Sequence, residues 1–435
     1  MVDPSSAAAL RKVSAACYVG SVIEFYDFLI YGTAAALVFP SVFFPELSHT
    51  LATVASLGTF ASAFVARPIG AALFGHLGDR VGRKRVLVIT LLLMGTSTVG
   101  VGLIPSAAAI GAWAALLLTA LRVVQGLALG GEWAGSALLG MEYAPPAKRG
   151  FYGMFTQLGL GTALVLANLV FLIVSAAFGS ASAAFLQWGW RIPFLLSVVL
   201  IVTALFVRTR VEETPSFLAD TDAEDRDEVP IAALLRSHRR QLLLAAGAVA
   251  GALALVYETG TYFTHYATVH LHYSTDFVLF VGVLGGLCAV VLVAVSATLS
   301  DTYGRHRVLR LGYLLAVPWS FAVLPLIQNG SKVLFAVTIM VSYLIIGIVT
   351  GPLASFVPEI FPTRYRYTGA GLAYNAGGII GGGIPPVISE YLLSSVGSWT
   401  IGVMLGALTL TSLLCVRSLE LAALSHRGSP DPAAP

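Results

Sequence analysis

The residues best suited to chemistry are two acids inside an apolar stretch. Residues 20–32 read GSVIEFYDFLIYG, and apolar residues flank Glu24 and Asp27 on both sides. Helical spacings of four, three and four place these acids on one face with Gly20 and Tyr31. An ionised side chain at the centre of a bilayer costs about 2.5–3.5 kcal/mol or more, so such residues tend to face a cavity and mark a pathway.

Further ionisable residues stand in other apolar stretches. A second polar face carries Arg122, Gln125 and Glu132, while Arg67 and Glu258 lie in two more stretches. We expect these charges to converge on one polar cavity. A carboxylic acid in an apolar cavity resists ionisation, and a neighbouring arginine favours the carboxylate, so a cavity with both can couple a proton to a bound anion.

Arg122 is the leading candidate for binding an acid group. Its guanidinium is always charged and offers a planar fork of donors suited to a carboxylate. We expect Arg122, with Gln125 and Arg67, to hold the acid group of a substrate. Further candidates for substrate contact are Tyr31, Tyr262, Tyr374 and Asn375. Candidates for carrying a coupled proton are Glu24, Asp27, Glu132 and Glu258. The alternative is that these charges form buried ion pairs that only fix helix packing.

The composition indicates that lipid is the solvent of this chain. Of its 435 residues, 57% are hydrophobic and 11% charged, with a mean hydropathy of +0.85. Soluble domains carry about 25% charged residues. Only helices and closed barrels satisfy every backbone group in lipid, and continuous apolar runs such as 86–104 favour helices over the alternating strands of a barrel. The sequence therefore predicts an all-α membrane protein.

Charge clusters and Gly/Pro breaks divide the chain into twelve transmembrane helices. They are predicted at roughly 13–39, 51–77, 86–105, 112–140, 151–178, 192–208, 242–270, 277–299, 308–327, 333–357, 368–392 and 399–416. With twelve helices, most of the 25 Lys and Arg residues fall on the side that holds both termini. Because positive charge marks cytoplasmic loops, both termini are predicted to be cytoplasmic.

Two pairs of similar segments indicate an internal repeat. GDRVGRKRVL (78–87) matches SDTYGRHRVL (300–309), and EYAPPAKR (142–149) matches EIFPTRYR (359–366). Six predicted helices separate the partners of each pair, so the two halves are parallel repeats with a site expected at their interface. We expect one bundle at 1–208, a cytoplasmic linker at 209–241, a second bundle at 242–416 and a cytoplasmic tail at 417–435.

Several motifs carry a resemblance to a known family. GHLGDRVGRKRVL (75–87) resembles the G-x-L-x-D-R-x-G-R-K loop motif of the major facilitator superfamily. GSVIEFYDF, FVARPIGAALFG, LRVVQGLALGGEW, WGWRIPFLL and FPTRYRYTGAGLAYN are similar to stretches of its metabolite:proton symporter family. Within that family the chain most resembles the shikimate-transporter-like subgroup, which also carries a glutamate in helix seven, here Glu258. The resemblance implies twelve helices in two six-helix parallel repeats and transport by alternating access.

The resemblance also implies a latch that closes the cytoplasmic side in the outward-open state. Its residues would be Asp79, Arg80, Gly82 and Arg83 in the first copy and Asp301, Gly304 and Arg305 in the second. The alternative is a simple stop-transfer charge cluster, which would not require the fixed D-R-x-G-R spacing. The second copy has Thr302 and His306 in place of an arginine and a lysine, so we expect a weaker latch there.

The segment VYETGTYFTHY and the residues after it raise two further expectations. Thr259, Gly260 and Thr261 are expected to loosen the helix and free backbone groups toward a cavity. His265, His270 and His272 approach the predicted outer end of the same helix. We expect them to be solvated surface residues, with sensing of external pH as the alternative.

These features predict a proton-coupled symporter that imports a small organic acid, such as shikimate or a dicarboxylate, across a bacterial inner membrane. A proline or glycine-betaine:proton symporter is the alternative, and an efflux antiporter is disfavoured because predicted helix five lacks proline. We expect a functional monomer in the lipid bilayer, without enzymatic activity, cofactor, metal or nucleic-acid partner. The sequence contains no P-loop, so ATP is not expected to drive transport.

Overall fold

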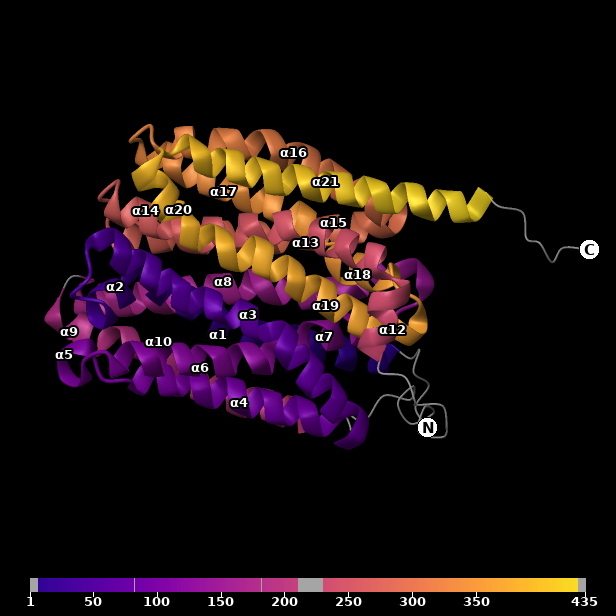
Figure 1. Ribbon diagram of the computed structural model, residues 1–435, viewed down its shortest axis with the longest axis horizontal. Helices are drawn as coiled ribbons and strands as arrows, with labels where there is room; N and C mark the ends of the chain where they lie inside the picture. Colours follow the sequence, from indigo (N-terminus) through magenta and orange to yellow (C-terminus); the bar gives the residue numbers. More distant parts are fainter. Residues whose placement is uncertain (1–6, 82, 181, 210–229, 429–435) are drawn as a thin grey trace, which may run out of the picture.

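The computed structural model describes residues 7–81, 83–180, 182–209 and 230–428, and all regular elements in these ranges are helical (Figure 1). Nine of the described helices are long and apolar enough to cross a membrane, and shorter apolar helices lie at Val88–Leu103 and Gly189–Thr203. The glycine-rich helical segment 366–395 completes twelve membrane-length units within these ranges, as predicted.

The first half of the chain forms the helices at the bottom of Figure 1. They are α1 (Ala7–Leu37), α2 (Phe39–Phe43), α3 (His49–Val81), α4 (Arg83–Leu103), α5 (Ala107–Ile110), α6 (Trp113–Leu129), α7 (Glu132–Glu142), η1 (Pro146–Lys148), α8 (Arg149–Phe178), α9 (Ala183–Gln187), η2 (Gly189–Arg191) and α10 (Ile192–Thr209). Most of the predicted linker, residues 210–229, lies outside the described residues.

The second half forms the upper helices of Figure 1. They are α12 (Pro230–Ser237), α13 (Arg239–Tyr257), η3 (Glu258–Tyr262), α14 (Phe263–Val269), α15 (Thr275–Tyr303), α16 (Arg305–Ile327), α17 (Lys332–Thr350), α18 (Leu353–Glu359), η4 (Thr363–Tyr365), α19 (Arg366–Gly378), η5 (Ile379–Gly383), α20 (Ile384–Ser395) and α21 (Trp399–Gly428). Helix α21 therefore continues beyond the predicted end at residue 416.

The two halves meet along a seam through the middle of the bundle. Helix α8 packs against α15, α3 packs against α19, η5 and α20, and α1 packs against η3 and α14. Helix α1 begins and α21 ends at the same end of the bundle, which we call the terminal end, and the opposite end is the distal end (Figure 1). The seam is the place where a site shared by both repeats must lie.

Several helices are interrupted where they approach the seam. The expected loosening at Thr259–Thr261 is confirmed, because α13 passes into the π-helical turn η3 at Glu258. A second π-helical turn, η5, lies in the glycine run of 379–383. Helices α6 and α7 are separated at Gly130 and Gly131. Such interruptions are frequent at functional sites because they change the direction of side chains and backbone groups.

Candidate functional site

Close packing of α3 on α6 places Arg67 and Arg122 on one side of the seam. A Cβ atom on Gly126 would lie 2.4 Å from the carbonyl oxygen of Ala63, and one on Gly130 would lie 2.2 Å from that of Arg67. Only glycine fits at these two positions. The pair forms the G-x-x-x-G pattern that lets membrane helices approach closely.

Arg122 is a fully buried cation, and only part of its guanidinium is hydrogen-bonded within the described residues. It is 0% exposed, and its Nη1 donates to Oε1 of Gln125 at 3.0 Å. Its guanidinium carbon lies 4.0 Å from the ring centres of both Phe28 and Tyr31. Nε and Nη2 have no hydrogen-bond partner among the described residues. Ring contacts of about 2 kcal/mol each when desolvated offset much of the several kcal/mol that burial of an ion costs, but they leave Nε and Nη2 without a hydrogen-bond acceptor among the described residues. The arrangement therefore favours binding of an anion.

An aromatic cluster covers both arginines at the seam. The guanidinium carbon of Arg67 lies 4.3 Å from the ring centre of Phe28 and 4.9 Å from that of Phe64. Tyr257 of the second half contacts Phe28, Phe60 and Phe64 at centroid distances of 5.6, 5.7 and 5.1 Å. These rings form the contact between the two halves at the level of the arginines.

The two acids of α1 diverge, although the sequence predicts that they share a face. Asp27 accepts hydrogen bonds from Thr98 Oγ1 at 3.0 Å and from Ser197 Oγ at 2.6 Å, so it faces α4 and α10 inside the first half. Glu24 is buried and interacts electrostatically with Tyr257, across the seam. The two acids therefore have different partners in this conformation, and their convergence on one cavity stays a prediction.

The remaining residues of the predicted polar face on α6 and α7 contact α4. Gln125 Nε2 donates to Thr98 Oγ1 at 2.8 Å, and Glu132 Oε1 accepts from Thr90 Oγ1 at 2.9 Å. Glu132 opens α7, just after the interruption between α6 and α7. Helix α4, which the sequence analysis did not single out, thus supplies the partners that orient two predicted site residues.

Glu258 and Tyr262 belong to a separate polar group in the second half. Oε1 of Glu258 accepts from Ser389 Oγ at 2.7 Å, and Tyr262 donates to Oε2 of Glu390 at 3.3 Å. Both bonds join η3 to α20. Glu390 is only 2% exposed and was missed, although it is an acid within a predicted helix, the same signal that identified Glu24.

Tyr374 and Asn375 reach across the seam to the interruption between α6 and α7. The ring of Tyr374 stacks on that of Trp133, with centroids 3.8 Å apart and planes at 8°. Asn375 Nδ2 donates to the carbonyl oxygen of Gly130 at 2.7 Å. In this conformation both residues hold the two halves together. Trp133 was not predicted, because an aromatic in an apolar helix gives no functional signal by itself.

The second copy of the loop motif joins the two halves at the terminal end. The carboxylate of Asp301 accepts from the amide nitrogens of Gly150 and Phe151, at the start of α8, at 2.7 and 2.8 Å. Anions are stabilised at helix N-termini, where backbone N–H groups lack partners within the helix. Arg305 lies 3.5 Å from Asp301 and 3.1 Å from Glu359. The predicted residue Asp301 thus contacts the first half, and Arg305 pairs with it from within the second half.

The remaining latch residues are only partly described. Gly304 has a φ of +89°, which favours glycine and ends α15 next to the ion pairs. Gly82 lies outside the described residues, as do the side chains of Asp79, Arg80 and Arg83. A role for the first copy, and a weaker latch in the second, therefore stay predictions.

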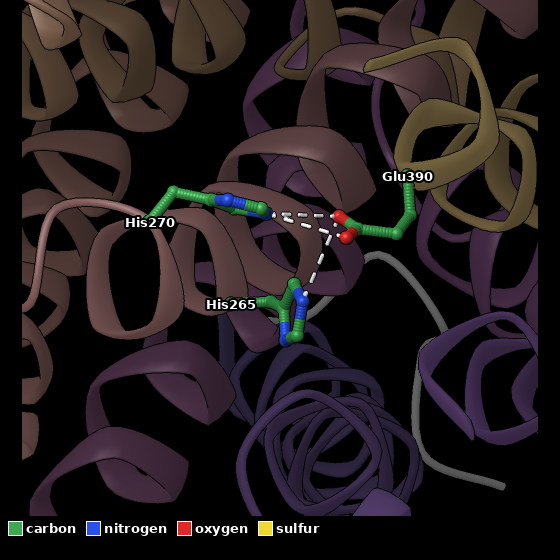
Figure 2. A group of neighbouring side chains, drawn as sticks. All are labelled: His265, His270 and Glu390. Atoms are coloured by element: carbon green, nitrogen blue, oxygen red, sulfur yellow. Dashed lines mark hydrogen bonds and ion pairs between the residues drawn. The ribbon is translucent and has the colours of Figure 1, made fainter. Parts of the chain in front are cut away.

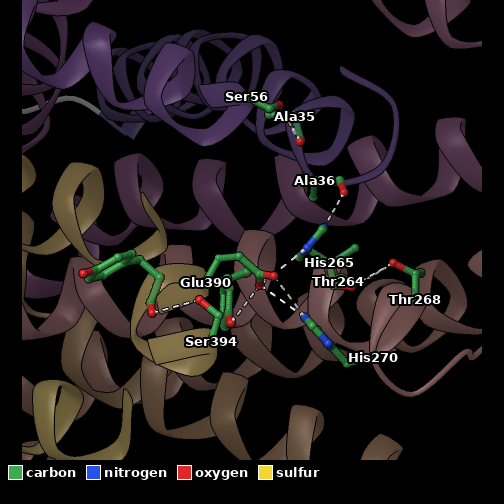
Figure 3. Close-up of polar contacts among 11 residues, drawn as sticks. Ala35, Ala36, Ser56, Thr264, His265, Thr268, His270, Glu390 and Ser394 are labelled. Carbon is green, nitrogen blue, oxygen red and sulfur yellow. Dashed lines mark hydrogen bonds and ion pairs between the residues drawn. The ribbon is translucent and has the colours of Figure 1, made fainter. Parts of the chain in front are cut away.

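Of the three histidines at the distal end, only His265 differs from the expectation of solvated residues. His265 is 1% exposed, and its Nδ1 lies 2.9 Å from the carbonyl oxygen of Ala36 in the first half (Figure 3). His270 and His272 are both exposed, as expected. His265 is buried because the end of α1 covers it, a contact between distant segments that helix periodicity cannot reveal.

Contacts between the halves close both ends of the bundle. Asp301 binds α8 at the terminal end, and His265 contacts α1 at the distal end. The two best-defined cavities are lined mainly by α8, α15 and α17 and include neither Arg122 nor Glu24. A ligand can therefore reach Arg122 only after the halves separate at one end.

The bundle consists of apolar helices in two halves, and charged side chains are buried where the halves meet. These features are those of a multi-pass membrane transporter. Residues 28–386 match the Major Facilitator Superfamily. The chain is 42% identical to the inner membrane metabolite transport protein YhjE of Escherichia coli (strain K12), with 93% of each chain covered. It is 35% identical to the shikimate transporter of that strain, covering 89% of each, and 34% identical to the proline/betaine transporter of Salmonella typhimurium (strain LT2), covering 89% of this chain and 78% of that one.

The fold agrees with this likeness. A crystal structure of a D-xylose-proton symporter superposes with a TM-score of 0.74 at 19% identity, covering 93% of this chain and 96% of the other. At this identity the likeness concerns the fold alone. The chain belongs to the major facilitator superfamily, and its relatives are transporters rather than enzymes.

Proposed function

We propose that this protein is a proton-coupled symporter that imports a small organic acid by alternating access. The observation that carries the proposal is Arg122, a fully buried cation with two nitrogens unpaired in the described structure. A substrate carboxylate would accept hydrogen bonds from both nitrogens and balance the charge. Because rings of both halves cover the arginine, the substrate would have to enter from an opened end and leave through the other.

Arg67 extends the site toward a second acid or polar group. It contacts the same ring, Phe28, as Arg122 does, and its Nε also lacks a hydrogen-bond partner among the described residues. Two guanidinium groups on one ring suit a dicarboxylate or a hydroxylated acid better than a hydrophobic ligand. One relative of this chain is named a shikimate transporter, and shikimate would meet this description.

Glu24 is the acid that we propose as the carrier of the coupled proton. It is buried and interacts electrostatically with Tyr257 and Tyr374 of the second half, so its surroundings change when the seam opens. The hydroxyls that bind Asp27 both lie in the first half and can keep their positions during a rigid-body movement. A group that carries a proton must exchange between two environments, and Glu24 meets this condition better than Asp27. Glu132 and Glu258 remain alternatives.

A zwitterionic osmolyte such as proline or glycine betaine is the second candidate substrate. The rings of Phe28, Phe60, Phe64 and Tyr257 pack around the arginines, with centroids 5.0–5.7 Å apart. Aromatic clusters of this kind can bind a quaternary ammonium group by cation–π contact, while Arg122 would bind the carboxylate. One relative is named a proline/betaine transporter.

The deciding experiment is an uptake assay with the purified protein in liposomes. Labelled shikimate, dicarboxylates, proline and glycine betaine are tested with and without an imposed pH gradient. We expect gradient-driven uptake of an organic acid, and loss of it by at least about 100-fold in R122A, the range found when a buried charge pair is broken. R310A is the control, because Arg310 forms an ion pair with Glu420 on the surface.

Two outcomes would contradict the proposal. Normal uptake by well-expressed R122A would remove Arg122 from the substrate site. Equal uptake rates with and without the imposed pH gradient would exclude proton symport. The expected topology in the bacterial inner membrane, with both termini in the cytoplasm, is tested in intact cells by the accessibility of a terminal tag. The liposome assay gives the active oligomeric state, for which we propose a monomer, when the number of chains per liposome is varied.

A further inference from the structure

A second polar cluster lies at the distal end, apart from the arginines. His265 of α14, His270 at the end of that helix and Glu390 of α20 point toward one another (Figure 2). His270 Nε2 lies 3.3 and 3.2 Å from the two carboxylate oxygens of Glu390, and His265 Nε2 lies 3.7 Å from Oε2. One ligand atom from each side chain can be chosen so that all three lie within 4.8 Å of one another.

The orientation of His265 leaves a buried lone pair directed at the cluster. Its Nδ1 lies 2.9 Å from the carbonyl oxygen of Ala36, which can only accept, so Nδ1 carries the hydrogen and Nε2 is the unprotonated nitrogen of the neutral ring (Figure 3). Nε2 has no hydrogen-bond partner among the described residues, although the side chain is 1% exposed. A buried polar atom without a partner costs about 1–3 kcal/mol. A bound cation would remove this cost.

The carboxylate of the cluster is also held in place. Tyr262 donates to Oε2 of Glu390 at 3.3 Å, and the carboxylate is 2% exposed. Metal-binding histidines usually donate their second N–H to a backbone carbonyl or a carboxylate, and metal-binding carboxylates are hydrogen-bonded in turn. The Ala36–His265 and Tyr262–Glu390 contacts reproduce both features.

The donor set and its dimensions select a class of metal. Zn²⁺ binds imidazole nitrogen and carboxylate oxygen at about 2.0–2.2 Å in tetrahedral geometry, which places ligand atoms about 3.4 Å apart. The distances from Glu390 to the two histidines, 3.2–3.7 Å, already bracket this value. Ca²⁺ and Mg²⁺ require six or more ligands, predominantly oxygen. Two histidines and one acid therefore favour Zn²⁺ or a similar late transition metal.

We propose that His265, His270 and Glu390 form a binding site for a divalent transition metal such as Zn²⁺, and that the bound metal holds the distal end closed. The metal would join α14 to α20 and polarise the ring of His265. This polarisation would strengthen the hydrogen bond from Nδ1–H of His265 to the carbonyl oxygen of Ala36 in the first half. His270, with a side chain 32% exposed, provides the entry path. A water molecule would complete the coordination.

Metal binding is measured on the purified full-length chain after any affinity tag has been removed. Calorimetric titration with ZnSO₄ should give one site per chain, unaffected by millimolar Mg²⁺ or Ca²⁺. H270A and E390Q each remove a proposed ligand and should weaken binding by at least about 100-fold, because loss of an outer-shell partner alone costs about 10–100-fold. H272N is the matched control, because His272 is exposed and has a φ of +54° that asparagine tolerates. Equal Zn²⁺ affinity in wild type, H270A and E390Q would overturn the site.

Closure of the distal end is tested by a distance measurement that needs no transported substrate. Spin labels are placed at S48C and S395C, exposed positions before α3 and at the end of α20, with Ala at positions 17, 288 and 415. Zn²⁺ should shift the distance distribution to the shorter population, and the shift should disappear with E390Q. An unchanged distribution at saturating Zn²⁺ would overturn the closing role. Because neither measurement involves uptake, failure of the proposed transport function leaves both results interpretable.

Discussion

Asp27 and Arg122 lie on different helices but are connected through two intervening side chains. Thr98 Oγ1 donates to Asp27 at 3.0 Å, Gln125 Nε2 donates to Thr98 Oγ1 at 2.8 Å, and Arg122 Nη1 donates to Gln125 Oε1 at 3.0 Å. These three hydrogen bonds link α1 to α6 through α4. They fix the amide orientation of Gln125 and leave the remaining N–H groups of Arg122 for a ligand.

Removing the hydroxyl of Thr98 should therefore weaken substrate binding. In T98V the shape is kept, but Gln125 loses its acceptor and Asp27 loses a donor. A buried polar group left unpaired costs about 1–3 kcal/mol, so we expect substrate affinity to fall about 5- to 150-fold in a binding titration with the transported acid. T96V is the control, because Thr96 is exposed and bonds only to carbonyls of its own helix. Equal substrate affinities of T98V and T96V would show that the hydrogen bonds through Thr98 do not affect the substrate site.

The terminal end should open more readily when Asp301 is replaced. D301A removes both acceptors for the first amides of α8, and loss of a helix N-cap costs about 0.5–2 kcal/mol. The buried Ser355 at this end accepts from Arg305 and serves as a reporter when changed to cysteine in a chain whose native cysteines are alanine. We expect alkylation of this cysteine to be about 2- to 30-fold faster with D301A.

The control for this measurement is T302A, which changes the exposed residue next to Asp301. T302A should label at the rate of the parent. Identical rates for D301A and T302A would mean that the carboxylate does not hold the halves together, and that the motif serves only as a charge cluster.

Neutralising the two acids of α1 should have different effects. E24Q removes the carboxyl group that we propose as the proton carrier, so counterflow exchange of substrate should continue while the imposed pH gradient no longer drives accumulation. D27N keeps its hydroxyl partners in the first half, so accumulation should persist, at reduced stability because one charged acceptor is lost. Both activities are measured in the same liposome preparation. Gradient-driven accumulation by E24Q would exclude Glu24 and direct attention to Glu132 or Glu258.

Helix number and buried charge were predictable because both follow from the cost of polar groups in lipid. An uncompensated acid in an apolar helix is rare enough to be informative wherever it occurs, and the same criterion would have identified Glu390. The run Thr-Gly-Thr predicted a loosened helix, and the structure shows the loosening as the π-helical turn Glu258–Tyr262. These signals are local, so one sequence is sufficient to read them.

The partners of each charge were not predictable, because they depend on how helices cross. Spacing in α1 places Glu24 and Asp27 near each other, yet Asp27 accepts from hydroxyls on α4 and α10, whereas Glu24 interacts electrostatically with Tyr257 of the second half. The burial of His265 likewise depends on the end of α1, more than 200 residues earlier in the chain. Such contacts are set by the register of helix packing, for which helical periodicity contains no information.

The crossing of α3 and α6 gives the sharpest test of how the arginines are positioned. In G126A the new methyl group would lie 2.4 Å from the carbonyl oxygen and 2.7 Å from the Cα of Ala63, both backbone atoms that cannot turn aside. The helices must separate, and Arg122, one turn away, moves with α6. Overpacking of this kind costs about 1–3 kcal/mol, so the midpoint of thermal unfolding in detergent should fall and substrate affinity with it.

G58A on the same helix α3 separates this packing effect from the general effect of an added methyl group. No atom lies within 4 Å of a Cβ at Gly58, and alanine in a helix interior is favoured over glycine by about 0.5–1 kcal/mol. We therefore expect G58A to unfold at the same temperature as the parent or higher, with unchanged substrate affinity. If G126A behaved like G58A, the close approach of α3 to α6 would not determine the position of Arg122, and the polar chain through Gln125 would have to position it alone.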